Sequence, residues 1–212
     1  MIGKFREQTT PFVRAVAAPV AALGISPNIF SALAIPLALA AGWFITQNSY
    51  GWGFVLAVLA VSIDLFDGAV ARLQKKESLF GNYFETMVDK AVEIILFVAC
   101  AFIFPVTSTM ALGLSMLASY AKPRAALVII SDNHDWPAIG EHSERMLLLL
   151  GGLLLSAFKF KLLGLTCLEL SLLAIAIISG IGSVQRVLYA KKLIVEAQRK
   201  GAILPYLKKK KR

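Results

Sequence analysis

Four carboxylates, those of Asp64, Asp67, Glu85 and Asp89, lie within a stretch of 26 residues that has apolar runs on both sides. At about 100° per residue, Asp64 and Asp67 fall on one face of a helix, and Glu85 and Asp89 fall on one face of the next. A hairpin between the two helices would bring all four acids together. Unpaired carboxylates at membrane depth are costly, so this arrangement needs cations, and two bound divalent metal ions, Mg²⁺ or Mn²⁺, would supply them.

Small and basic residues accompany these acids. Gly68 and Ala71 share the face of the first acid pair, and Gly81 shares the face of the second. The glycines let a phosphate or nucleotide approach the helix backbone, and Arg72 is placed to contact phosphate oxygens. An acid beside bound metals can also take a proton from an attacking hydroxyl. The pattern therefore predicts metal-assisted transfer of a phosphoryl group at a membrane surface.

Two other interpretations of the acids stay open at this point. The acids could form interfacial salt bridges, because Arg72, Lys75, Lys76 and Lys90 are near them in sequence. They could also line the pathway of a small divalent-cation transporter. A pathway would need acids at several depths across the spans, whereas these acids gather at one membrane face.

The composition is typical of a membrane protein. Of the 212 residues, 58% are hydrophobic, and the mean hydropathy is +0.71. Soluble domains rarely reach these values. Several apolar runs approach the roughly 20 residues needed to cross a bilayer. We therefore predict an all-α integral membrane fold with six transmembrane helices, at about residues 28–46, 52–74, 79–104, 110–130, 141–158 and 163–188.

The segment before the first span has a mixed pattern. Residues 3–23 are partly amphipathic and predict an interfacial helix at the membrane surface, with a short soluble arm as the alternative. Ser26 and Pro27 are typical of an N-cap and a first helical position, so they open the first span. The predicted organisation is one membrane domain over residues 1–212, with a juxtamembrane helix at 1–24, a six-helix bundle at 27–190 and a basic cytoplasmic tail at 191–212.

The net charge of +9 is unevenly distributed. With the N-terminus inside, the outer turns carry only Lys159 and Lys161. The inner segments carry Lys4, Arg6, Arg14, Arg72, Lys75, Lys76, Lys122, Arg124, Arg145 and the whole C-terminal set. This bias predicts that both termini and the acid cluster are cytoplasmic. The run Lys208–Arg212 suits anionic headgroups, and no aromatic residues alternate with it as in a nucleic-acid site, so we expect no nucleic-acid partner.

The acids and their neighbours form the longer pattern Asp64-x-x-Asp67-Gly68-x-x-Ala71-Arg72, then eight residues, then Gly81-x-x-x-Glu85-x-x-x-Asp89. This pattern resembles the signature of the CDP-alcohol phosphotransferases, which has Asp at all four acid positions with the same spacing. The chain length, the span count and the Pro-Asn pair that opens the first span also agree. The resemblance implies a six-span homodimer that transfers a substituted phosphate from a CDP-alcohol to an acceptor hydroxyl and releases CMP.

The resemblance also implies roles for individual residues. Asp89 would be the general base for the acceptor hydroxyl. Glu85 departs from the family pattern: it keeps the charge but adds a methylene, which could alter the metal spacing, change the acceptor or remove activity. We expect activity to be retained, because the rest of the signature is intact. The implied metal ligands are Asp64, Asp67, Glu85 and Asp89, and the implied neighbours of the CDP moiety are Asn28, Asp67, Gly68, Ala71, Arg72 and Gly81.

Three later segments, 119–124, 141–145 and 184–186, resemble the inositol-phosphate-using branch of the family, in which basic residues hold the acceptor's phosphate. The corresponding candidates are Lys122, Arg124, Arg145 and Arg186, and the alternative for each is an ordinary cation that anchors a helix at the headgroups. We therefore predict an integral membrane enzyme of phospholipid biosynthesis with a CDP-lipid donor. The expected acceptor is an inositol phosphate or a similar phosphorylated polyol, with glycerol phosphate or serine as alternatives.

Overall fold

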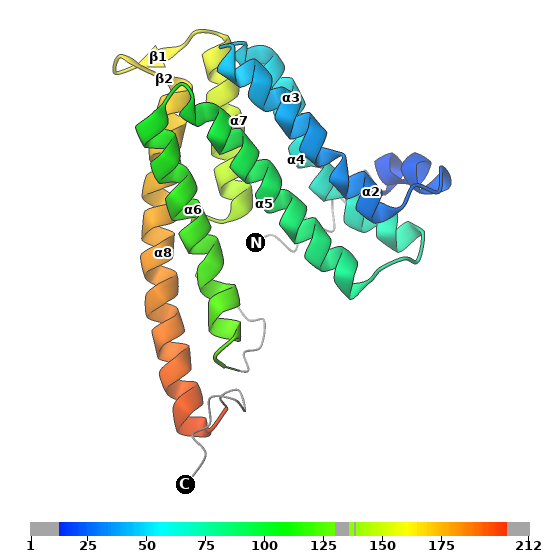
Figure 1. Ribbon diagram of the computed structural model, residues 1–212, viewed down its shortest axis with the longest axis vertical. Coiled ribbons are helices and arrows are strands. Elements are labelled where there is room, and N and C mark those ends of the chain that lie inside the picture. Colours follow the sequence, from blue (N-terminus) through cyan, green and yellow to red (C-terminus); the bar gives the residue numbers. More distant parts are fainter. Residues whose placement is uncertain (1–12, 130–135, 138, 203–212) are drawn as a thin grey trace. The chain divides into compact units, whose positions relative to one another are not determined.

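The structure is a computed structural model that describes residues 13–129, 136, 137 and 139–202 (Figure 1). Predictions for residues 1–12 and for the Lys208–Arg212 run lie outside the described residues. The chain is mostly helical, as predicted, and forms two compact units. The first unit comprises Met1–Ile103 with Ser156–Phe158, and the second comprises Phe104–Leu155 with Lys159–Arg212.

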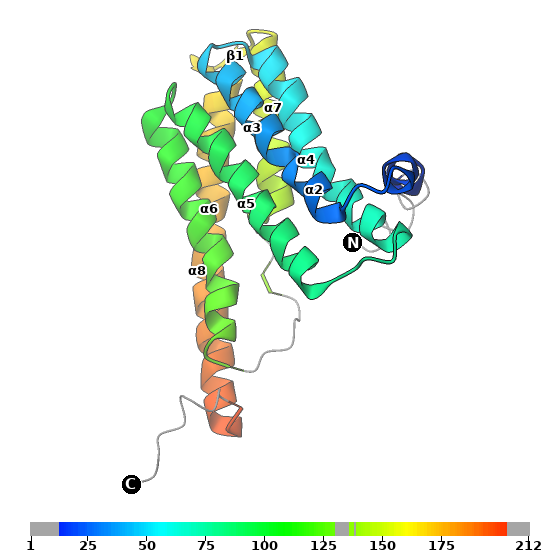
Figure 2. The same cartoon turned by 45° about the vertical axis from the view of Figure 1, so that its right-hand side comes forward.

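The first unit is a group of packed helices. Helix α3 packs against α4 and α5, and the short α2 packs against the same two helices (Figure 2). An N-terminal helix over Val13–Ala22 precedes them. The bounds are Pro27–Ala32 for α2, Ala34–Thr46 for α3, Tyr50–Leu73 for α4 and Leu79–Ala101 for α5.

The first predicted span is not one continuous helix. It begins at Pro27 behind the N-cap residue Ser26, as predicted, but it is interrupted at Leu33 between α2 and α3. The cause is Pro36, which has no N–H to donate to the carbonyl of Ala32 and whose ring crowds that carbonyl. The sequence analysis missed this break, which leaves α2 as a separate short segment beside the acids.

The N-terminal helix packs against the C-terminal end of α4, the end that the sequence predicts to be cytoplasmic. Ala17 is fully buried there in one cluster with Val70. The side-chain amide of Gln74 donates hydrogen bonds to the carbonyls of Ala21 and Ile25, at 3.2 and 2.9 Å. This helix is therefore joined to α4 by packing and hydrogen bonds, and the choice between an interfacial helix and a short soluble arm stays open.

The second unit is dominated by α6 and α8, which run side by side (Figures 1 and 2). Their contact includes the buried hydroxyls of Ser115 and Ser179, which are 3.1 Å apart. The bounds are Pro105–Ala126 for α6, His142–Ala157 for α7, Lys161–Leu162 for β1, Leu165–Thr166 for β2 and Cys167–Lys200 for α8.

Two predicted turns were wrong in detail. Residues 105–109 lie between the predicted spans 79–104 and 110–130 and were expected to form a turn, but they are the start of α6, because proline is well suited to the first helical position. The segment near Lys161 was expected to be a simple turn, but it forms an antiparallel two-stranded hairpin, with Leu163 and Gly164 both at positive φ. Helix α8 then begins at Cys167, where the Thr166 side chain accepts a hydrogen bond from the backbone of Glu169.

Helix α8 extends well beyond the predicted span. It was expected to end near residue 188, but it continues to Lys200 and closes on Gly201 in the left-handed conformation. Its last turns carry Arg199 and Lys200, which interact favourably with the carbonyl end of a helix. The first part of the predicted basic tail is therefore helical.

Three stretches of the described chain are long and apolar enough to cross a bilayer: Pro27–Thr46, Tyr50–Leu73 and Cys167–Lys200. The other three predicted spans are helices with weaker membrane character. Helix α5 carries four charged side chains, α6 is rich in hydroxyl groups, and α7 has 16 residues. The number of spans therefore stays a prediction.

A close backbone approach in the second unit gives a stability prediction. A Cβ atom at Gly182 of α8 would overlap the carbonyl oxygen of Ile139. We expect Gly182→Ala to displace that segment and to destabilise the protein by about 1–3 kcal/mol, the range typical of overpacking. The measurement is thermal unfolding of the purified protein in detergent.

Gly180→Ala on the same helix is the matched control. Its Cβ would meet only the Leu114 side chain, at an ordinary 3.6 Å. Both substitutions gain the same helix propensity, so the difference between their melting temperatures isolates the overlap with Ile139. Equal melting temperatures would contradict the close approach.

Candidate functional site

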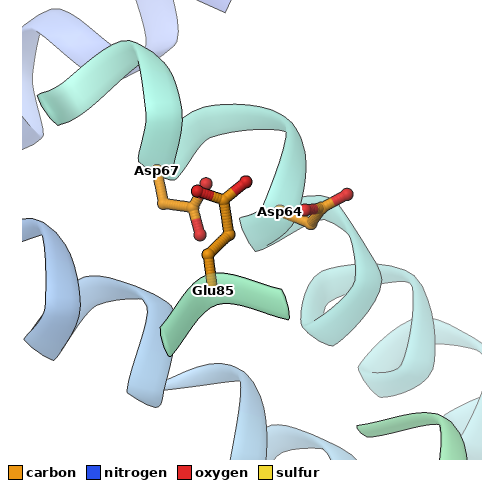
Figure 3. Close-up of side chains that lie close together, drawn as sticks. All are labelled: Asp64, Asp67 and Glu85. Carbon is orange, nitrogen blue, oxygen red and sulfur yellow. The ribbon is translucent and has the colours of Figure 1, made fainter. Parts of the chain in front are cut away.

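The four acids come from two consecutive helices of the first unit. Asp64 and Asp67 lie on α4, and Glu85 lies on α5; one carboxylate oxygen from each of the three is within 4.8 Å of the others (Figure 3). Figure 3 shows the Glu85 side chain rising from α5 toward the two aspartates of α4. Asp89, one turn farther along α5, is close enough to Asp64, Asp67 and Glu85 for the carboxyl groups to interact electrostatically. The predicted meeting of the acids on a helical hairpin is confirmed.

The connection between α4 and α5 explains this meeting. Helix α4 ends in a Schellman motif: Lys75 is left-handed with φ +54°, and the Lys76 N–H donates to the carbonyl of Ala71 at 2.9 Å. Helix α5 begins after Ser78, whose hydroxyl accepts a hydrogen bond from the Gly81 N–H at 2.9 Å. Because the connection is short, α5 starts close to the end of α4, and the acids at the end of α4 face those at the start of α5.

A cavity of about 790 Å³ opens between these elements. Its wall contains eight of the residues singled out from the sequence, while Asp89, one turn beyond Glu85 on α5, is not part of the wall. The eight residues are Asn28, Asp64, Asp67, Gly68, Ala71, Arg72, Gly81 and Glu85.

The two glycines of the pattern lie where other groups come close. A Cβ atom at Gly81 would be 3.0 Å from the Ser78 hydroxyl and 3.5 Å from the Asn28 side-chain oxygen. A Cβ atom at Gly68 would be 3.5 Å from a terminal nitrogen of Arg72. The wall of one cavity therefore contains the amide of Asn28, the guanidinium of Arg72 and the two glycines, whose backbone carries no side chain.

Sequence reasoning missed Ser31 on α2. Its hydroxyl donates to a carboxylate oxygen of Asp67 at 2.7 Å, and both side chains are buried. The only sequence signal was a polar residue one turn after Asn28 in an otherwise apolar run. Arg14 was not predicted to line the cavity, and Lys76 was considered only as a salt-bridge partner of the acids; both belong to the cavity wall.

One of the four basic residues considered as salt-bridge partners of the acids, Lys90, is paired with a different carboxylate. Lys90 forms an ion pair with the buried Glu93 at 2.8 Å. Arg72 and Lys76 are exposed and belong to the cavity wall. Carboxylate oxygens from two helices converge beside the cavity, and this donor set suits a hard divalent cation.

The four basic candidates for an acceptor site all belong to the second unit, and they divide into two classes. Lys122 and Arg124 are exposed on α6, whereas Arg145 and Arg186 are buried. Arg145 donates to the carbonyl of Gly140 and, at 3.3 Å, to the hydroxyl of Ser119.

Arg186 is held by the backbone of two segments. Its Nε donates to the carbonyl of Pro137 at 3.2 Å, and one terminal nitrogen donates to the carbonyl of Ala118 at 2.8 Å. The two buried guanidiniums are close enough to interact electrostatically. Their buried, backbone-bonded position differs from that of a cation that extends freely to the headgroups.

The chain is similar in sequence to known proteins over most of its length. The family model for CDP-alcohol phosphatidyltransferase matches residues 24–182. An archaetidylinositol phosphate synthase of Pyrococcus horikoshii is 30% identical over 199 residues, which cover 91% of this chain and 97% of the relative. Another protein of that name, from Methanothermobacter thermautotrophicus, is 26% identical over 156 residues, covering 72% and 76% of the two chains.

Solved structures share the fold. The phosphatidylinositol phosphate synthase of Mycobacterium tuberculosis with CDP-DAG bound superposes with a TM-score of 0.70 at 23% identity, covering 84% of this chain and 92% of that one. The same enzyme with manganese and citrate gives a TM-score of 0.72 at 20% identity, covering 84% and 88%. The family model matches three quarters of the chain, and the matched residues include the acid motif and most of the cavity wall. This integral membrane protein therefore belongs to the CDP-alcohol phosphatidyltransferase family and is a transferase.

Proposed function

We propose that this protein transfers a phosphatidyl-type group from a CDP-lipid to the hydroxyl of a small phosphorylated polyol and releases CMP. The observation that carries the proposal is the convergence of the motif on one cavity, with three carboxylates within 4.8 Å of one another and Asn28, Gly68, Arg72 and Gly81 in the same wall. A nucleoside diphosphate lipid needs this combination of carboxylates, a phosphate-binding cation and close backbone approach.

The acids would hold two divalent cations, Mg²⁺ or Mn²⁺. Asp64, Asp67, Glu85 and Asp89 supply the oxygens, and the longer Glu85 side chain reaches the two aspartates of α4, so its extra methylene is compatible with the role. When bound, such cations neutralise a pyrophosphate and stabilise its leaving oxygen.

The chain's own residues account for the remaining requirements of the reaction. Arg72 and the backbone at Gly68 and Gly81 bind the CDP moiety, and Asn28 contacts the nucleotide. Asp89 accepts the proton of the acceptor hydroxyl. The acceptor oxygen then forms a bond to the lipid-side phosphorus, the bond from that phosphorus to the bridging oxygen breaks, and CMP leaves with the electron pair.

The acceptor would be an inositol phosphate. Two relatives carry the name archaetidylinositol phosphate synthase, and the cations Lys122, Arg124, Arg145 and Arg186 are suited to an acceptor phosphate. Buried Arg145 and Arg186 would be preorganised by their backbone hydrogen bonds, and exposed Lys122 and Arg124 would add charge.

The membrane arrangement follows the distribution of Lys and Arg. We infer six spans with both termini and the acid site on the cytoplasmic side. The N-terminal helix would lie at the membrane surface, and two copies of the chain would form a homodimer, as the family resemblance implies.

The decisive test is CMP release by the purified protein. The protein is incubated with a CDP-lipid, Mg²⁺ or Mn²⁺, and one of four acceptors: inositol phosphate, inositol, glycerol phosphate or serine. We expect CMP only when donor, metal and acceptor are all present, with inositol phosphate the best acceptor and with no release after chelation by EDTA. Metal uptake into proteoliposomes without CMP release from any mixture would favour a transporter instead.

A further inference from the structure

Asp67 differs from the other two acids of the close cluster in its surroundings. Its side chain is buried, with 3% exposed, whereas Asp64 and Glu85 are partly exposed. A buried carboxylate is costly unless its oxygens accept hydrogen bonds. Both oxygens of Asp67 do so: one accepts from the backbone N–H of Gly68 at 2.6 Å, and the other accepts from the hydroxyl of Ser31 at 2.7 Å.

The Ser31 hydroxyl connects two helices. Ser31 lies on α2, is itself 4% exposed, and is 36 positions from Asp67 in the chain. Its oxygen is also 3.1 Å from the carbonyl of Pro27. A hydroxyl has one hydrogen to donate, and the shorter contact to a charged acceptor takes it. The bond to Asp67 therefore fixes the carboxylate of α4 against the neighbouring helix.

We propose that Ser31 is a positioning residue for the metal site: its hydroxyl sets the orientation of the Asp67 carboxylate. The proposal rests on the proposed function of the acids as metal ligands. A carboxylate held at both oxygens has lost its rotational freedom, yet each oxygen keeps a second lone pair for a cation. Asp67 is then a ligand whose orientation is set before a cation binds.

Groups that orient a metal ligand typically contribute about 10–100-fold to metal affinity. We expect Ser31→Ala to weaken Mn²⁺ binding by about this factor and to leave kcat near the wild-type value at saturating Mn²⁺. Ser31→Thr keeps the hydroxyl, so we expect it to restore most of the affinity. The measurement is a titration of the purified protein with Mn²⁺, followed by the electron paramagnetic resonance signal of the free ion, with no donor or acceptor present.

Ser115→Ala is the matched control. Like Ser31, Ser115 is buried and hydrogen-bonded to another helix, but it belongs to the second unit. We expect this variant to bind Mn²⁺ as the wild type does.

Wild-type Mn²⁺ affinity in Ser31→Ala would overturn the proposal. So would an equal loss in Ser31→Thr at an unchanged melting temperature, because packing rather than the hydroxyl would then be responsible. The titration needs no substrate, so a failure to release CMP from any donor would refute the proposed function separately.

Discussion

Replacing Asp89 with asparagine will reduce CMP release by about 10²–10⁴-fold, the range that a positioned general base contributes. Asparagine has the shape of aspartate but takes no proton from the acceptor hydroxyl, and it lacks the charge that a metal ligand provides. The amide has the size of the carboxyl group and removes a negative charge that lies close to the other acids, so we expect the fold to persist. The measurement is CMP release together with thermal unfolding of the same purified sample.

The control for charge removal is Glu196→Gln on α8. This carboxylate is exposed, and it pairs with Lys200 one turn away at 2.6 Å. We expect transfer at the wild-type rate. Near-normal CMP release by folded Asp89→Asn would show that another group takes the proton, and the base assignment would be wrong.

Glu85 is the position where this chain departs from the family pattern, and two substitutions there should have opposite outcomes. Glu85→Ala removes a carboxylate from the close cluster with Asp64 and Asp67. Since loss of a group that merely orients a ligand costs about 10–100-fold in affinity or activity, loss of the ligand itself should cost at least as much. Glu85→Asp restores the family residue, and we expect it to keep most of the activity.

The measurement is CMP release as a function of Mn²⁺ concentration for both variants. For Glu85→Ala we expect the required Mn²⁺ concentration to rise and the maximal rate to fall. If Glu85→Asp were as inactive as Glu85→Ala, the site would depend on the longer side chain. If Glu85→Ala were fully active, the carboxylate would have no role in the reaction.

The acid site was predictable because its geometry is local. Spacings of three and four residues place Asp64 with Asp67, and Glu85 with Asp89, on single helical faces. The five residues between α4 and α5 leave room only for a hairpin, so the two faces must meet. The positions of the remaining helices do not affect this geometry.

Ser31 was not predictable in the same way. Nothing in the sequence relates α2 to α4 across 36 positions, and in an apolar span every face is hydrophobic, so periodicity does not reveal which side faces a neighbour. The interruption at Leu33 had a local cause in Pro36, but a proline in a membrane span is often tolerated, and its effect depends on the surrounding helices.

The basic candidates show another limit of the sequence. Counting Lys and Arg predicted which side of the membrane they occupy. It did not distinguish the buried Arg145 and Arg186 from the exposed Lys122 and Arg124. Only the packing of the second unit separates the two buried guanidiniums from the two exposed cations. Burial depends on contacts far apart in the sequence, such as that between Arg186 and the carbonyl of Ala118.

The N-terminal helix has a practical consequence for protein engineering. The family match begins at residue 24, which would make that residue a natural place to shorten the chain for expression. Such a truncation would uncover Val70, remove one of the two carbonyls that Gln74 binds, and delete Arg14 from the cavity wall. The boundary of the family domain is therefore not the boundary of the folded unit, and purification tags are better joined ahead of the whole helix.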